Sequence, residues 1–259
     1  MGEDKLHKRV ALVTGGSRGI GRAVSLALAA QGAAVAVNYR SGEDQARQVV
    51  REISDAGGTA IAVAGDVAEP ADAAAIVERT VGDLGGLHIL VNNAGISRDA
   101  LIFNMEAEDW LAVMRVNFGG VFNCTKAVMR HFMAQRDGVI VNVSSVMGER
   151  GWIGESNYAA SKGAVNAFTR CCAMELSRFG VRVNAVLPGF AATELVSELV
   201  AKDGGKGIRK QIPMRAFGTV EEVAHVVAFL AGPDSSYMTG SLIAVDGGAS
   251  TALGLGRSE

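Results

Sequence analysis

Short apolar runs alternate with longer amphipathic stretches along nearly all of this 259-residue chain. The runs, such as Val10–Val13 and Ala33–Val37, lack polar side chains, which is typical of strands buried on both faces. Helical patterns lie between them, as at Glu43–Ala56. A strand, a helix and a second strand form a right-handed crossover, so the strands run parallel and helices cover the sheet. The alternation therefore predicts an α/β fold with one doubly wound parallel sheet and helices on both faces.

Seven strands are expected in this sheet, and no internal repeat, low-complexity tract or linker separates them, so residues 1–259 are expected to form a single domain. The expected strands are Val10–Val13, Ala33–Val37, Thr59–Ala64, Leu87–Val91, Val139–Val143, Val181–Leu187 and Leu242–Val245. The expected helices are Ile20–Ala30, Glu43–Ala56, Pro70–Val81, Glu106–Gln135, Asn157–Phe179 and Val220–Leu230. The long connection at residues 190–215 indicates a substrate loop or lid, with an exposed helical excursion as the alternative.

Composition excludes several classes of function. The formal net charge of −2 gives no electrostatic footprint for nucleic acid or an anionic membrane surface. No stretch reaches the roughly 18 apolar residues of a membrane span, and the polar N-terminus lacks the apolar core of a signal peptide. Three cysteines are too few for a disulfide framework, and the adjacent Cys171 and Cys172 are expected to be small buried residues. We therefore expect a cytoplasmic protein without a metal site.

A glycine-rich turn leads from the first strand into the first helix. Gly15 permits the tight turn, Gly19 lets the backbone approach a pyrophosphate, and Gly21 permits close helix–strand packing. The helix N-terminus then offers free N–H groups to the anion. The candidate cofactor-binding residues here are Gly15, Ser17, Arg18, Gly19, Ile20 and Gly21. The strand–turn–helix context predicts a Rossmann-type nucleotide-binding site.

The ends of the next strands indicate which nucleotide binds. NAD enzymes carry an acidic residue after the second strand, but this chain has Tyr39, Arg40 and Ser41 there. Arg40, together with Arg18, could clamp a 2′-phosphate, so we expect NADP(H) rather than NAD. Further candidates follow the third and fourth strands, namely Asp66, Val67, Asn93, Ala94 and Gly95. Asp66 could accept from an adenine amino group, whereas the Asn92 and Asn93 amides could equally cap strand ends.

A phenol, an ammonium group and a hydroxyl are predicted to meet at the same edge of the sheet. Tyr158 and Lys162 are four residues apart on one helix and share a face, and Ser145 follows the Val139–Val143 strand. Tyr158 can donate a proton to the alkoxide that develops when a ketone is reduced, and Ser145 can stabilise the growing negative charge. Lys162 is expected to draw the Tyr158 pKa down toward working pH.

The whole pattern resembles the short-chain dehydrogenase/reductase family over roughly residues 8–250. The resemblance rests on the glycine turn, Asn92–Gly95, Ser145, the Tyr158/Lys162 pair, Pro188–Gly189 and Val245–Gly248. It implies a fourth catalytic residue, Asn117, which kinks its helix, and a hydrogen bond from Lys162 to the nicotinamide ribose. It also implies that the nicotinamide is flanked by Pro188, Gly189, Ala191 and Thr193. The family's strand order 3-2-1-4-5-6-7 and its homotetramer are further expectations.

Within the family, the segments from Asn93 to Asp99 and from Ser145 to Gly148 look most like 3-oxoacyl-(acyl-carrier-protein) reductases of fatty acid synthesis. This resemblance implies reduction of a 3-oxoacyl thioester of acyl-carrier protein or CoA by NADPH. Two departures are notable. Glu155 stands where these reductases commonly have Gln, and its carboxylate could reject acyl thioesters, select another ketone or point to solvent. Phe179 occupies one of two basic carrier-docking positions. Arg136 matches the other docking position, with Arg178 adjoining Phe179 and with Lys126 and Arg130 as candidate companions.

Two other functions remain open. One is a reductase or dehydrogenase with the same mechanism but another ketone or alcohol, such as a polyketide, sugar, steroid or diketone. The other is a nucleotide-sensing binding protein without activity, which would be expected to lose Tyr158 or Lys162, both of which are present. The long helices are apolar over a wide arc, including Val165, Phe168 and Leu176, which predicts burial against the sheet and against a second subunit.

Overall fold

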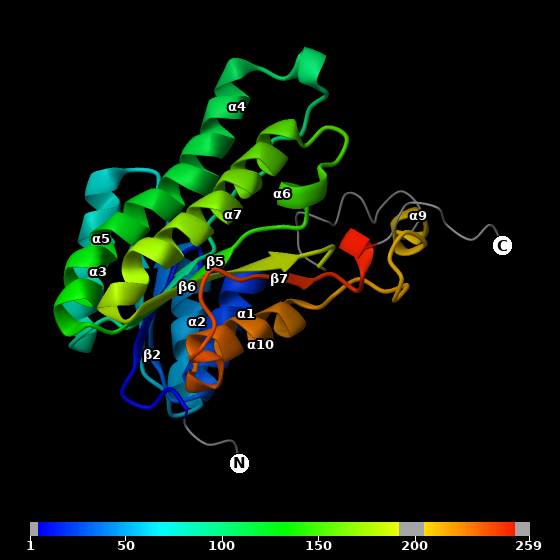
Figure 1. The fold of residues 1–259 in the computed structure, drawn as a ribbon. Coiled ribbons are helices and arrows are strands. Elements are labelled where there is room, and N and C mark those ends of the chain that lie inside the picture. The colour runs from blue at the N-terminus through cyan, green and yellow to red at the C-terminus, as the bar shows by residue number, and fades with distance from the viewer. Residues whose placement is uncertain (1–4, 192–204, 252–259) are drawn as a thin grey trace.

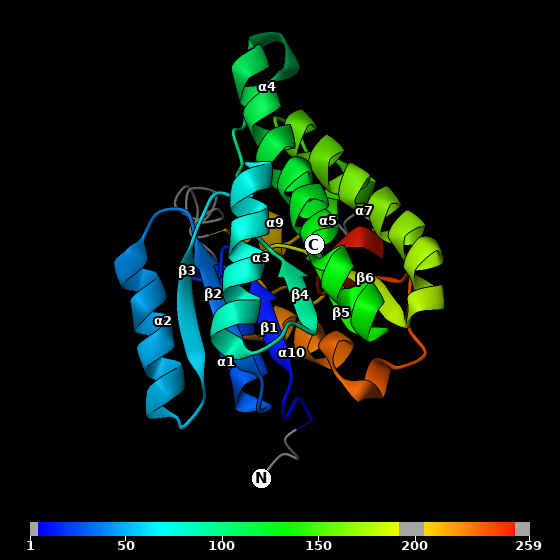
Figure 2. The same cartoon turned by 90° about the vertical axis from the view of Figure 1, so that its left-hand side faces the viewer.

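A seven-stranded parallel sheet organises the protein, and the computed structural model describes residues 5–191 and 205–251. The strand order is β3-β2-β1-β4-β5-β6-β7, which confirms the expected topology (Figure 2). The strands are β1 (Val10–Val13), β2 (Ala34–Tyr39), β3 (Ala60–Ala64), β4 (Ile89–Asn92), β5 (Gly138–Val143), β6 (Val181–Pro188) and β7 (Leu242–Val245). Most bounds lie within two residues of the expected ones, because uninterrupted apolar runs leave little freedom in placing a strand.

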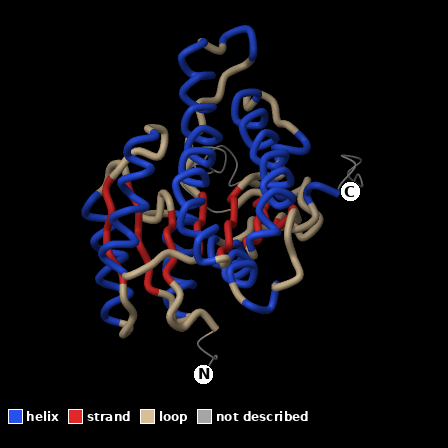
Figure 3. The backbone as a smooth tube through the Cα atoms, turned by 60° about the vertical axis from the view of Figure 1, so that its left-hand side comes forward, coloured by secondary structure: helices blue, strands red, loops and turns tan. Residues whose placement is uncertain are grey.

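Helices cover both faces of the sheet, as Figures 1 and 3 show. On one face lie α1 (Gly19–Ala30), α2 (Glu43–Asp55) and α10 (Val220–Ala231); on the other lie α3 (Pro70–Leu84), α5 (Gly120–Gln135) and α7 (Ser156–Leu176). Each layer has its own apolar core against the sheet, one around Val24 and Val227 and the other around Ile76 and Phe132. Among the described residues, no helix is long and apolar enough to cross a membrane.

The expected single helix over Glu106–Gln135 is divided in the structure. It consists of α4 (Ala107–Met114), a π-helical segment at Arg115–Gly119, and α5. The π-helical turn contains Asn117, so the helix changes geometry at the residue that the family resemblance marks as a kink. In Figure 1, α4 extends beyond the edge of the sheet.

Several short elements have too few residues for a periodic pattern in the sequence, namely α6 (Met147–Arg150) and the 3-10 turns at Ile102–Asn104, Pro233–Ser235 and Ala249–Thr251. A 3-10 turn at Ser177–Phe179 ends the helix expected over Asn157–Phe179, and α9 (Lys206–Arg209) lies in the 190–215 connection, where a helical excursion is the alternative expectation. The expectation for the adjacent cysteines is half wrong, since Cys172 is buried but Cys171 is exposed. Neighbouring residues on a helix point about 100° apart, so only one of them faces the core.

A line of buried polar side chains ties two helices to the centre of the sheet. The Asn92 side-chain amide of β4 donates to Asn142 Oδ1 of β5 at 2.9 Å and to Thr125 Oγ1 of α5 at 3.3 Å. The Asn142 amide then donates to Thr169 Oγ1 of α7 at 2.9 Å. All four residues are buried, where an unpaired polar group would cost free energy, so these bonds fix α5 and α7 over the sheet.

The parallel register brings the carboxyl ends of the central strands to one edge. Val13 of β1 pairs with Val91 of β4, and Val143 of β5 pairs with Val186 of β6. The loops that follow these strands therefore lie side by side, and they contain the glycine turn and the candidate catalytic residues.

Candidate active site

Three candidate catalytic side chains meet where α7 passes the end of β5. Lys162 is buried and its Nζ donates to the Val143 carbonyl oxygen at 2.9 Å. The same Nζ lies 5.5 Å from the centre of the Tyr158 ring. Ser145 is also buried, its hydroxyl accepts a hydrogen bond from Met147 N at 3.1 Å, and it interacts with the Tyr158 hydroxyl. The arrangement can present a proton donor and a hydrogen-bond donor to one carbonyl oxygen.

The fourth candidate, Asn117, is fully buried at the foot of the site. Its Oδ1 accepts from Ile96 N at 2.8 Å, and its Nδ2 donates to Ile96 O at 3.0 Å and to Ser161 Oγ at 3.1 Å. A side chain at Gly95 would meet Asn117 Oδ1 at 3.2 Å and Lys162 Nζ at 3.7 Å. Asn117 therefore holds the loop after β4 close to the catalytic lysine.

Burial is the largest influence on the pKa values of Tyr158 and Lys162. It raises the pKa of Tyr158 to about 12, while the interaction with Ser145 acts in the opposite direction. It lowers the pKa of Lys162 to about 8. The expectation that Lys162 draws the Tyr158 pKa down is therefore wrong for this structure, because the cost of burying a phenolate outweighs any help from the neighbouring ammonium.

The turn after β1 has the shape that a phosphate requires. Gly15 and Gly19 adopt left-handed φ values of 60° and 53°. A Cβ on Gly21 would lie 2.2 Å from the Gly15 carbonyl oxygen, so only glycine fits there. No side chain caps the N-terminus of α1 and no acidic residue lies in its first turn, so its N–H groups suit an anion. Ser17 lies within this turn, and Ile20 lies in the first turn of α1.

Two asparagines hold the turn in place. Asn93 Nδ2 donates to the carbonyl oxygens of Thr14 and Gly15 at 2.9 and 3.1 Å. Asn38, the penultimate residue of β2, accepts from Gly15 N at 3.3 Å and donates to the carbonyls of Val63 and Gly65. Of the two roles left open for the Asn93 amide, these contacts support strand-end capping. Ala94 and Gly95 continue this loop towards the catalytic lysine.

The two residues expected to bind a 2′-phosphate, Arg40 and Arg18, lie after β2 and in the glycine turn. Arg18 and Arg40 are exposed, and Arg40 Nη1 lies 3.7 Å from Asp66 Oδ2. Asp66 Oδ1 accepts from Ala68 N at 2.9 Å, so this carboxylate also shapes the turn before α3. Tyr39 is partly buried and Ser41 exposed in the same region, and Val67 is buried.

The end of β6 forms the opposite side of the site. The Pro188 carbonyl accepts from Val146 N at 3.1 Å, next to Ser145. A side chain on Gly189 would collide with Asp246 Cβ at 2.7 Å, and Ala191 is buried and bridges to Gly218. The candidate Thr193 lies outside the described residues, as does half of the 190–215 loop, residues 192–204.

An aromatic wall beside Tyr158 was only partly foreseen. The Trp152 and Phe190 rings lie 5.4 Å apart, and Phe190 and Phe217 lie 6.4 Å apart, each pair edge to face. Trp152, Phe190 and Tyr158 pack against a small apolar cluster that includes Met147. Phe217 comes from a distant part of the chain, and no local pattern in the sequence indicates its contact with Phe190.

Comparisons with known proteins agree with this geometry. A family model described as enoyl-(acyl carrier protein) reductase matches residues 15–250. A 3-oxoacyl-[acyl-carrier-protein] reductase of Synechocystis is 46% identical over 244 residues, covering 94% of this chain and 97% of the relative. A reductase of the same name from Staphylococcus aureus is 42% identical over 238 residues, covering 92% and 96%.

Solved structures of similar proteins share the fold over nearly the whole chain. A gluconate 5-dehydrogenase from Burkholderia cenocepacia, in complex with NADP and tartrate, has a TM-score of 0.92 and 38% identity, covering 97% of this chain and 98% of its own. A putative short-chain alcohol dehydrogenase from Sinorhizobium meliloti has a TM-score of 0.92 and 33% identity, covering 97% and 100%. With a matching family model, close relatives and this arrangement of Ser145, Tyr158 and Lys162, the chain belongs to the short-chain dehydrogenase/reductase family.

Proposed function

We propose that this protein reduces a 3-oxoacyl thioester to the 3-hydroxyacyl product with NADPH, and that residues 1–259 form one catalytic domain. The observation that carries the proposal is the meeting of Ser145, Tyr158 and Lys162 beside the glycine turn, in a chain 46% identical to a 3-oxoacyl-[acyl-carrier-protein] reductase. The catalytic residues are Asn117, Ser145, Tyr158 and Lys162.

The residues present fit NADPH. The Gly15–Gly21 turn and the uncapped start of α1 would hold the pyrophosphate, and Arg18 and Arg40 the 2′-phosphate. Lys162 would hold the nicotinamide ribose, and the NADP-bound gluconate 5-dehydrogenase supports the choice of cofactor. When bound, the reduced nicotinamide supplies the hydride.

The chain's own groups manage the proton and the charge. Burial keeps Tyr158 protonated, so it can donate its proton to the oxygen of the ketone as negative charge develops there. Ser145 donates a hydrogen bond to the same oxygen and so stabilises the charge. Lys162, with a pKa of about 8, is mostly an ammonium at neutral pH and stabilises the phenolate that Tyr158 becomes.

Replacing the proton donor tests this mechanism. Tyr158→Phe keeps the ring and removes the acid, so we expect kcat to fall at least ~100-fold, the scale typical of acid–base groups. NADPH affinity, measured by the fluorescence of the bound cofactor, should stay nearly unchanged. Lys162→Ala should reduce both turnover and NADPH affinity, because Lys162 serves the ribose and Tyr158 together. Normal turnover by Tyr158→Phe with an acetoacetyl thioester would refute the assignment.

The cofactor preference depends on the two exposed arginines. Arg40→Asp replaces attraction for the 2′-phosphate with repulsion, and each such charge-assisted contact contributes roughly 1.5–3 kcal/mol. We expect a tenfold to hundredfold shift of kcat/KM from NADPH towards NADH, measured with one ketone. Arg51→Asp on the exposed face of α2 is the control and should leave the preference unchanged. Equal use of both cofactors by the unmodified enzyme would contradict the 2′-phosphate clamp.

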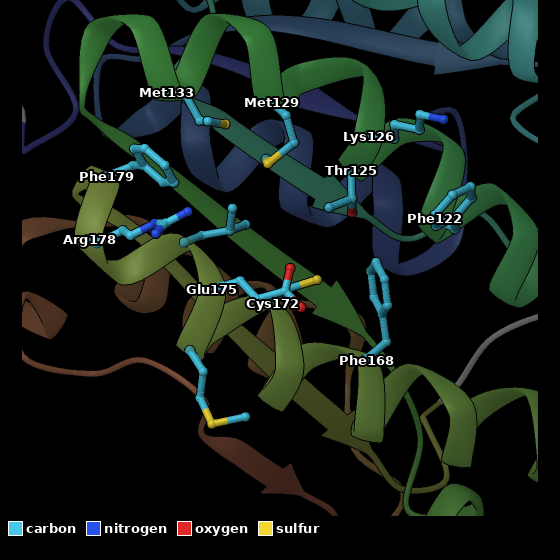
Figure 4. Close-up of a pocket in the computed structure, with 12 residues that line it drawn as sticks. Phe122, Thr125, Lys126, Met129, Met133, Phe168, Cys172, Glu175, Arg178 and Phe179 are labelled. Atoms are coloured by element: carbon cyan, nitrogen blue, oxygen red, sulfur yellow. The ribbon is translucent and has the colours of Figure 1, made fainter.

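An apolar groove between α5 and α7 supports the proposed homotetramer (Figure 4). The groove has a volume of about 650 Å³ and is lined by Phe122, Met129 and Met133 from α5 and Phe168 and Met174 from α7. Met174 is 74% exposed and Phe122 45% exposed, which leaves large apolar side chains open to water. A second copy of the same helix pair would cover them.

Sedimentation at micromolar concentration checks the assembly, and we expect a tetramer. Phe122→Glu places a charge in the groove and should shift the protein to smaller species, because burying an unpaired carboxylate is costly. Gln48→Glu makes the same charge change on the exposed face of α2 and should not alter the assembly. A monomer in the unmodified protein would exclude the homotetramer.

A small basic surface supports docking of an acidic acyl-carrier protein. The Arg136 guanidinium donates to the Arg178 carbonyl at 2.8 Å, so the two residues lie together although they are far apart in sequence. Lys126 and Arg178 line the α5–α7 groove, which a second subunit would cover in the proposed assembly. Arg136 is not among the residues that line the groove, so it is the best candidate for contact with a carrier, with exposed Arg130 as a companion.

Reversing this charge should separate carrier-bound from free substrates. With Arg136→Glu we expect kcat/KM for a carrier-bound 3-oxoacyl substrate to fall, and to fall further at low salt, where surface charges are less screened. Reduction of a small free ketone should not change, because the hydride site is untouched. Arg51→Glu is the charge-matched control. Equal effects on both substrates, or none on either, would favour a small-ketone reductase.

A further inference from the structure

Glu155 is a half-buried carboxyl group without a structural task. It directly precedes α7 and lies three residues before Tyr158, close to one helical turn away. Its side chain does not cap the helix. Among residues 5–191 and 205–251, its side chain takes part in no hydrogen bond or ion pair, whereas its backbone N–H donates to the Trp152 carbonyl and its carbonyl accepts from Ala159 N. A carboxyl group that is half buried beside a proton donor and left unpaired calls for a functional explanation.

A second carboxylate faces Glu155 from the loop after β4. The Ala100 N–H donates to the Gly154 carbonyl at 2.9 Å, and Asn157 Nδ2 donates to the Arg98 carbonyl at 2.9 Å. These bonds fasten the loop to the start of α7 and bring Asp99 close enough to interact electrostatically with both Glu155 and Tyr158. The mouth of the site is therefore negatively charged when both carboxyl groups are ionised.

Within residues 5–191 and 205–251, no cation forms an ion pair with Glu155. Arg98 in the same loop pairs with Asp109 at 2.6 Å. Lys162 Nζ donates to the Val143 carbonyl. The Arg209 guanidinium lies 5.7 Å from the centre of the Phe217 ring. Phe217 contacts Phe190, and Phe190 in turn contacts Trp152. On α6, Glu149 and Arg150 are both exposed.

We propose that Glu155 is a specificity-determining residue, which makes the enzyme reject ketones that carry a negative charge near the carbonyl and accept uncharged ones. The inference rests on the proposed reductase function, because the ketone oxygen must reach Tyr158 and the rest of the substrate then lies near Glu155. The apolar wall of Trp152 and Phe190 limits screening by water, so a like charge is repelled more strongly than at an open surface.

The similar proteins act on two classes of substrate by name, 3-oxoacyl thioesters and sugar acids, and Glu155 would discriminate between them. A 3-oxoacyl thioester is uncharged at its reacting end, since the phosphate lies at the far end of the long pantetheine arm. A ketone derived from a sugar acid brings its own carboxylate into the site. Glu155 therefore favours the thioester over the sugar acid, although a solved structure with 38% identity is a gluconate 5-dehydrogenase.

Rejection should depend on pH in a defined direction. Burial, with Asp99 adding to it, raises the pKa of Glu155 to about 7. Below this value Glu155 is mostly neutral and repels little; above it the carboxylate forms and repels anions. The ratio of kcat/KM for an uncharged ketone to that for an anionic ketone should therefore rise as pH increases through about 7.

Ethyl acetoacetate and the acetoacetate anion form a suitable pair, since they share the ketone and differ mainly in charge. We expect the kcat/KM ratio to rise on the order of tenfold between pH 6 and pH 8, as Coulomb's law gives for two charges several ångströms apart in a partly screened site. Lys162 titrates in every variant, so the comparison with Glu155→Gln isolates Glu155. In that variant the rise centred near pH 7 should disappear.

Two further variants sharpen the test. Asp99→Asn removes the neighbour that raises the Glu155 pKa, so the midpoint of the rise should move to lower pH. Glu149→Gln removes an exposed carboxylate from α6 and should leave both ratio and midpoint unchanged. A purely structural Glu155 would alter stability or kcat for both ketones without changing their ratio.

The outcomes distinguish this inference from the proposed function. If ethyl acetoacetate and an acetoacetyl thioester are reduced but Glu155→Gln keeps the same pH-dependent ratio, the role of Glu155 is refuted and the reductase function stands. If no ketone is reduced, the proposed function fails. Calorimetric binding of both ketones to the enzyme with NADP⁺, where no hydride can be delivered, then decides the role of Glu155: equal pH dependence of the two affinities would overturn it.

Discussion

The attachment of α7 to the carboxyl end of β5 is the constraint on which the site depends. Lys162 reaches back from the helix to the Val143 carbonyl, and the Ser144 hydroxyl donates to the Lys162 carbonyl at 3.1 Å and to Asn166 Oδ1 at 2.6 Å. A side chain on Gly148 would lie 2.7 Å from the Lys162 backbone, so α6 packs directly on the same turn. Because these contacts are buried and geometrically specific, Tyr158 cannot drift from Ser145 without breaking several of them.

The same burial that gives rigidity sets the chemistry. Burial raises the pKa of Tyr158 to about 12 and lowers the pKa of Lys162 to about 8, so the two pKa values move apart and both shifts oppose a phenolate beside an ammonium. The phenol is therefore a stable proton donor, which suits reduction of a ketone. Glu155 experiences the same effect: burial raises its pKa to about 7, so that Glu155 and Lys162 both titrate near neutral pH.

Electrostatics divide the surface into regions with separate tasks. Exposed Arg18 and Arg40 lie in the glycine turn and after β2, Arg136 contacts Arg178 beside the α5–α7 groove that Arg178 lines, and Asp99 and Glu155 lie near Tyr158. A net charge of −2 conceals this division, since opposite local charges cancel in the sum. Under the proposed function, separate substitutions would therefore change the selection of cofactor, carrier and ketone.

Sequence by itself determined the parallel α/β fold, the glycine turn, and the shared helix face of Tyr158 and Lys162. These features depend on periodicity and on steric limits that act over a few residues, so they can be recognised locally. Tertiary structure decided the π-helical break at Asn117, the strand-capping role of Asn93, the raised pKa of Tyr158, and the facing of Asp99 and Glu155. Each of these four features arises from contacts between distant segments or from the exclusion of water. The spacing of residues along the chain encodes neither the contacts nor the exclusion of water.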